Sequence, residues 1–92
     1  MPQIFKIGGY LLYFWSNEED PLEPVHFHIT DGVPTKDATK VWMTKSGHCL
    51  LCHNKSNIPQ HKLKKIMDIA EARHKFIVDK WHEYFKEIRF YC

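Results

Sequence analysis

Two histidines separated by a single residue are the strongest sign of chemistry in this sequence. His26 and His28 lie in the alternating segment Val25-His-Phe-His-Ile29, and in a strand such residues project side by side from one face. This spacing suits two ligands of a transition metal, or two imidazoles that act as acid and base. Glu23, or the Glu18-Glu19-Asp20 run, supplies a carboxylate nearby. The alternative is a pair of partly exposed histidines on the outer face of a half-buried strand.

A second pattern, Cys49-Leu-Leu-Cys52-His53, has the spacing of a c-type haem attachment site. Haem is attached in exported proteins, and no export signal precedes this segment. The segment also reads as a strand, which would send Cys49 and Cys52 to opposite faces. A closed zinc site needs four ligands, and the chain has no second cysteine pair. We therefore expect reduced thiols here and no haem, and a transition metal at His26 and His28 is the one cofactor we retain.

Lys62, Lys64 and Lys65 cluster where a helix is expected to begin. Positive charge opposes the helix dipole at that end, so an anionic group nearby would relieve the repulsion. Lys62 and Lys65 are therefore candidate binding residues for phosphate. The aromatic residues available to stack on bases are Tyr10, Tyr13 and Trp15. The alternative is an ordinary solvated helix face.

The elements that must position these residues begin with strands. Segments of alternating or continuous apolar character predict strands at about 3–7, 10–15, 25–30, 39–44 and 49–53. Gly8-Gly9 joins the first two, because a tight two-residue turn requires positive φ. Five strands in succession predict an antiparallel meander, and with the helix that follows they predict an α+β fold.

One long helix is predicted from about 59 to 88, because apolar residues recur there at spacings of three, four or seven. Pro59 suits the first turn of that helix. The helix would be roughly 45 Å long at about 1.5 Å per residue, which is more than a small sheet covers. We expect its distal end to project or to pack on another chain.

Length and charge exclude some classes of function but do not identify one. The chain has 92 residues, 43% of them hydrophobic, which predicts a single domain spanning residues 1–92. Thirteen basic against eleven acidic residues give a net charge of +2, so no global field indicates nucleic acid. No apolar run is long enough to span a membrane, and no secretory signal is seen, which predicts a cytoplasmic protein.

The motifs together resemble the bacterial domain-of-unknown-function family 4160. The resemblance rests on the opening Pro2-Gln-Ile-Phe-Lys-Ile-Gly-Gly-Tyr10, the strand Glu23-Pro-Val-His-Phe-His-Ile29, and the helix segments Leu63–Ile66 and Lys80–Phe85. It implies a small stand-alone protein, often encoded beside a second small protein of the domain-of-unknown-function family 2442. That arrangement looks like a toxin–antitoxin pair. Residues 34–53 and the tail from Arg89 to Cys92 depart from the family pattern.

Three functions follow as expectations. The first is a partner-binding component of a toxin–antitoxin-like pair, whose partner is a small cognate protein or a second copy. The second is a small hydrolase or RNase-like toxin that uses His26 and His28 with Glu23. The third is a nucleic-acid-binding regulator. No motif for an enzymatic nucleophile is present, so we favour the first, a binding protein rather than an enzyme.

Overall fold

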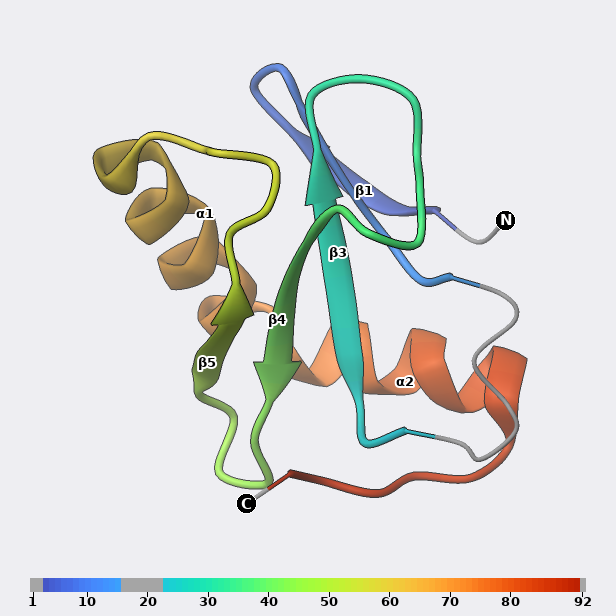
Figure 1. Ribbon diagram of the computed structural model, residues 1–92. Coiled ribbons are helices and arrows are strands. Elements are labelled where there is room, and N and C mark those ends of the chain that lie inside the picture. The colour runs from blue at the N-terminus through green and yellow to red at the C-terminus, as the bar shows by residue number, and fades with distance from the viewer. Residues whose placement is uncertain (1–2, 16–22, 92) are drawn as a thin grey trace.

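The sheet has the predicted number of strands in the predicted order. The computed structural model describes residues 3–15 and 23–91. Its strands pair antiparallel in the order β1-β2-β3-β4-β5, each beside its neighbour in sequence (Figure 1). Their bounds are β1 Gln3–Ile7, β2 Tyr10–Tyr13, β3 His26–Thr30, β4 Thr39–Met43 and β5 Cys49–His53. The α+β class and the five-stranded meander are confirmed, with β2 two residues shorter than expected.

The turn between β1 and β2 uses its glycines unequally. Gly8 takes a φ of 59°, whereas Gly9 does not have a positive φ. A Cβ atom at either position would meet no other atom within 4 Å. The need for glycine at Gly8 is therefore conformational, and the tip of the hairpin is open on both sides.

The single long helix predicted for residues 59–88 is wrong, because the structure has two helices. Helix α1 spans Gln60–Ala72 and α2 spans His74–Phe85, with the break at Arg73, whose φ is −113°. The whole molecule measures only 32 × 26 × 20 Å. A straight helix of roughly 45 Å would overhang it, so the bend returns α2 to the sheet, behind β3 and β4 in Figure 1.

The distal part of the helical segment therefore does not project. Trp81 and Phe85 of α2 are buried against the sheet, and burial of two large aromatic side chains provides the driving force for the bend. The helix ends at Phe85, where Lys86 adopts the left-handed conformation with φ of 64°. Among the described residues, neither helix is long and apolar enough to cross a membrane.

The middle of the sheet is covered on both faces. The face toward the helices carries apolar side chains, which pack against α1 and α2. The second face is covered by irregular segments: the Tyr13 hydroxyl hydrogen-bonds Thr35 in the β3–β4 connection, and Tyr91 of the C-terminal segment stacks on Trp42 with ring centroids 5.0 Å apart. The side chains of the core are Ile4, Leu12, Phe14, Val25, Phe27, Ile29, Val41, Met43, Cys49, Ile58, Leu63, Ile66, Ala70, Ile77, Trp81 and Phe85.

Candidate functional site

The two motif histidines lie in the middle strand of the sheet. All five residues of β3 are buried, and the side chains of His26 and His28 are each only 1% exposed. In the register of the sheet His28 lies beside Tyr13 of β2 and Lys40 of β4, while His26 lies beside Trp42. The alternation that places both histidines on one face is confirmed. The expectation that this face is partly exposed is wrong, because the β3–β4 connection, the C-terminal segment and Trp81 of α2 cover it.

Backbone carbonyls orient both imidazole rings. The Nδ1 atom of His26 lies 2.8 Å from the carbonyl oxygen of Pro24, and that of His28 lies 3.2 Å from the carbonyl oxygen of Ala38. A carbonyl oxygen only accepts hydrogen bonds, so Nδ1 carries a hydrogen and donates it in each of these contacts. The rings meet edge to face, with centroids 5.4 Å apart. The contact of His28 fixes the β3–β4 connection onto the sheet, and that of His26 fixes the segment just before β3.

Aromatic side chains surround the histidines. Tyr13 stacks on His28 with ring centroids 5.5 Å apart, and His26 meets Trp42 and Trp81 edge-on at 5.5 and 5.3 Å. The Tyr13 hydroxyl donates to the carbonyl of Thr35 at 2.6 Å and accepts from the Thr35 N–H at 3.0 Å. Burial raises the pKa of the Tyr13 phenol, although both hydrogen bonds oppose the rise. This environment resembles a packed interior.

Glu23 is held by a lysine. Its carboxylate pairs with the ammonium group of Lys40, which also lies 4.5 Å above the ring of Trp42. The Glu18-Glu19-Asp20 run, the other predicted source of a carboxylate, lies outside the described residues. Within residues 3–15 and 23–91, the structure brings together no group of three or more His, Cys, Asp or Glu side chains that could hold a metal ion.

The cysteine motif lies in β5. Cys49 is buried and its Sγ atom lies 3.7 Å from the carbonyl oxygen of Met67, whereas Cys52 is exposed, and both are free thiols. Burial raises the pKa of Cys49 to about 12, with smaller contributions from Glu71 and Asp68. Burial also lowers the pKa of His53, with Lys55 contributing in the same direction. The motif therefore has the strand geometry inferred from the sequence. Cys92, the third cysteine, lies outside the described residues.

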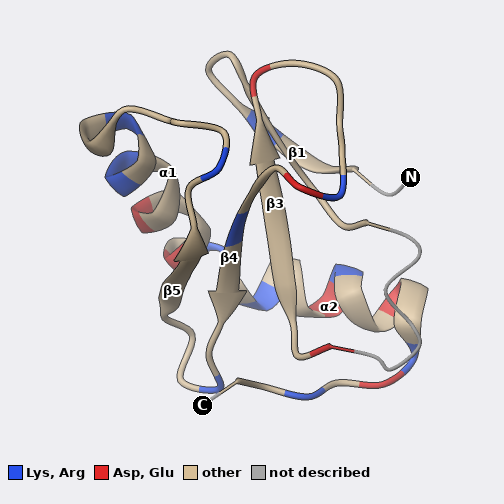
Figure 2. Ribbon diagram, viewed as in Figure 1, with Lys and Arg blue, Asp and Glu red and all other residues tan. Residues whose placement is uncertain are grey.

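Strand β5 forms an exposed edge of the sheet that the sequence patterns above did not indicate. Leu50 and Leu51 are 40% and 41% exposed, and β5 pairs only with β4. Figure 2 shows no charged residue on β5, in contrast to β4 and α1. The available signal was an uncharged final strand, Cys-Leu-Leu-Cys-His, at the end of a meander. A strand with these properties is a template for pairing with another chain.

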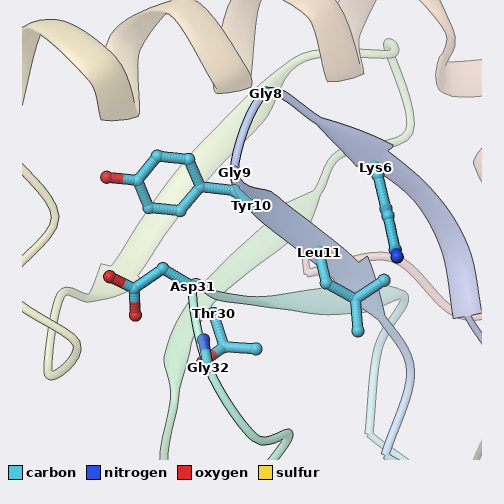
Figure 3. Close-up of a pocket in the computed structure, with 8 residues that line it drawn as sticks. All are labelled: Lys6, Gly8, Gly9, Tyr10, Leu11, Thr30, Asp31 and Gly32. Atoms are coloured by element: carbon cyan, nitrogen blue, oxygen red, sulfur yellow. The ribbon is translucent and has the colours of Figure 1, made fainter.

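The candidate phosphate-binding residues lie beside the tip of the β1–β2 hairpin. Lys62 and Lys65 line a pocket of about 230 Å³ together with Gly8, Gly9 and Tyr10. A second pocket of about 260 Å³ lies on the other side of the same tip. In that pocket Tyr10 and Asp31 point to one side and Lys6 to the other (Figure 3). The structure thus brings residues of the N-terminal hairpin and of α1 together at one turn.

Comparison with known proteins identifies the family. No curated protein and no solved structure matches the chain significantly. One protein family does match, over residues 9–82. The matched region runs from the hairpin tip through the buried histidine strand to α2, and so contains most of the fold described above. The chain therefore belongs to the family named domain of unknown function (DUF4160).

Proposed function

We propose that this protein is the partner-binding component of a toxin–antitoxin-like pair, and that it binds its partner through the edge of β5. The observation that carries the proposal is the exposure of Leu50 and Leu51, at 40% and 41%, on an uncharged edge strand. Exposed apolar edges are uncommon in natural proteins because they promote pairing with other strands. An edge that is left open in this way is suited to a partner.

The backbone of β5 directs the N–H and C=O groups of Leu51 away from β4, where a partner strand would bond to them. The N–H of Thr44 bonds to the carbonyl of His48 at 2.8 Å, so these two residues form a bonded pair of the ladder. Opposed pairs in an antiparallel ladder alternate between bonded and non-bonded, and Leu51 lies three positions after His48. Leu51 lies in a non-bonded pair with Val41, so its N–H and C=O point away from β4. Cys49 follows the same rule, because its outward N–H donates to the Glu71 carboxylate at 2.8 Å.

The opposite edge of the sheet is protected. Strand β1 contains Lys6 and has an irregular register between Gln3 and Phe5. The guanidinium group of Arg73 lies 5.7 Å from the ring of Phe5 and shields it. Charges and bulges are the usual devices that block strand pairing. In β5 the register shift falls near Cys52, and the outward N–H of Cys49 is taken by Glu71, which leaves Leu50 and Leu51 as the regular, uncharged and open stretch.

The occupant we propose is an extended apolar segment of a second small protein. Strand addition supplies affinity through main-chain hydrogen bonds and specificity through alternate side chains. Leu50 and Leu51 point to opposite faces of the sheet, so a segment paired with β5 would contact both. The resemblance to the family points to a cognate protein of the domain-of-unknown-function family 2442 as that partner. Catalysis by His26 and His28 is less favoured, because both side chains are about 1% exposed.

The test is co-expression with the product of the neighbouring gene, followed by affinity purification and size-exclusion chromatography. Leu51→Pro removes the outward N–H without removing a ladder hydrogen bond, and proline is tolerated at such edge positions. Leu51→Val is the matched control, because it keeps the N–H and an apolar side chain and has high strand propensity. We expect the wild type and Leu51→Val to co-elute with the partner and Leu51→Pro to elute alone.

Thermal unfolding of both variants shows whether Leu51→Pro still folds. If Leu51→Pro is folded and still co-elutes with the partner, β5 is not the binding edge. If the wild type does not bind the partner and elutes instead as a dimer of itself, the two-protein proposal is wrong.

A further inference from the structure

We infer that the pocket between the β1–β2 hairpin tip and the start of α1 binds a nucleoside monophosphate unit. The phosphate would lie between Lys62 and Lys65, and the base would lie on the apolar floor. This site is distinct from the β5 edge and does not depend on the proposed function. The unit would be a free nucleotide or one residue of a single-stranded RNA.

The cationic rim of the pocket is the first observation. Lys62 and Lys65 both line it, and neither forms an ion pair with any residue that the structure describes. The neighbouring Lys64 differs, because its ammonium group pairs with Asp68 at 3.1 Å. Helix α1 has no acidic residue in its first turn. Two lysines are thus left uncompensated at the positive end of a helix dipole, where an anion is stabilised.

The open hairpin tip is the second observation. Gly8 and Gly9 line the pocket, and a Cβ atom at either would meet nothing within 4 Å. The backbone of the turn is therefore accessible to a ligand from this side. Glycine permits close approach of a ligand to the main chain, as in other phosphate-binding loops.

The apolar floor of the pocket indicates what the phosphate is attached to. Ile7, Tyr10 and Ile66 complete the lining, and an aromatic ring is a stacking surface for any base. The volume of about 230 Å³ is below the roughly 300–1,000 Å³ of sites for drug-sized ligands. The pocket is therefore too small for a dinucleotide cofactor, which limits the ligand to one nucleotide unit at most. Asp31, which would repel a phosphate, borders the other pocket at this tip.

The experiment is an NMR titration of the full chain with adenosine 5′-monophosphate, adenosine, inorganic phosphate and a short oligoadenylate. We expect saturable shifts of the Gly8, Gly9 and Lys62 amide signals with the monophosphate or the oligoadenylate. Tighter binding of the monophosphate than of the oligoadenylate identifies a free nucleotide as the ligand, and the reverse order identifies RNA. Adenosine and phosphate alone should bind at least tenfold more weakly.

Variants of three neighbouring lysines complete the test. The double variant Lys62→Ala/Lys65→Ala should lose at least tenfold in affinity, and oligoadenylate binding should lose about 0.7 of its logarithmic salt slope for each lysine removed. Lys64→Ala, which removes a lysine from the same turns but not from the pocket, should change affinity less than twofold. The inference is overturned if no probe shifts these amides, if phosphate alone binds as well as the monophosphate, or if Lys64→Ala weakens binding as much as the double variant.

Discussion

Strands β3 and β5 have the same length but opposite surroundings. The five residues of β3 are all buried, and they include the two histidines with the clearest chemical spacing. Three of the five residues of β5 are exposed, and they include two leucines. The histidine pair with the clearest chemical spacing is therefore enclosed, while two ordinary leucines are accessible. Spacing in the sequence identifies residues that share a face of a strand. The segments packed over that strand decide whether those residues contact only each other or are accessible to a partner.

The largest expected effect is a loss of stability when a histidine is removed from β3. His28→Ala leaves a cavity in a packed region and leaves the carbonyl of Ala38 without its hydrogen bond. We expect the free energy of unfolding to fall by about 2–4 kcal/mol. The matched control is His53→Ala, because His28 and His53 lie on either side of Lys40. His53 is a half-buried residue of β5, so this substitution should lower the free energy of unfolding by less than about 1 kcal/mol. Equal losses in urea titrations of the two variants would contradict the contrast between the strands.

A smaller effect is expected at Tyr13, which fastens the cover of β3. Tyr13→Phe removes both hydrogen bonds to Thr35 and should cost about 1–2 kcal/mol at neutral pH.

The same variant has a pH signature. The pKa of Tyr13 is raised in the folded state, so folding favours the protonated phenol. Its contribution to stability is present below the unfolded pKa of about 10 and is lost as pH rises through the folded pKa. Wild type should therefore lose more stability than Tyr13→Phe between neutral pH and strongly alkaline pH. Parallel pH profiles of the unfolding free energy would show that Tyr13 does not contribute.

Much of the fold follows from the sequence, because its signals are local. Alternation of side chains gives β3, and Gly8 marks the tight turn between β1 and β2. The break between α1 and α2 carries no such signal, since Ala72-Arg73-His74 contains neither glycine nor proline and the apolar stripe continues across it. The bend results from the size of the sheet, which is a tertiary property.

The candidate site was harder to predict for the same reason. The spacing of His26 and His28 correctly indicates a shared face, but it does not show that the connection after β3, at Thr35–Ala38, folds back over this face. Nor does it show that Tyr91, far along the sequence, packs there. Lys62 and Lys65 were identified from their charge, yet their position beside Gly8 requires the packing of α1 against the hairpin.

The smallest expected effect on stability comes from chemical labelling of a cysteine in β5. Cys52 is exposed, whereas Cys49 is buried with a pKa raised to about 12. Because the thiolate is the reactive form, a thiol reagent at pH 8 should modify Cys52 well before Cys49. The label on Cys52 should change the free energy of unfolding by less than about 0.5 kcal/mol. Peptide mass mapping distinguishes the two sites. Faster modification of Cys49 than of Cys52 in the native protein would show that the face of β5 that carries Cys49 is accessible to solvent.

Hydrogen exchange at two adjacent amides tests the central claim most directly. The N–H of Leu50 points into the ladder with β4, and that of Leu51 points outward. In the free protein the Leu51 amide should exchange much faster than the Leu50 amide. On formation of the complex with the partner, the Leu51 amide should become slow while the Leu50 amide changes little. A complex in which Leu51 still exchanges at its free rate would contradict strand addition at β5.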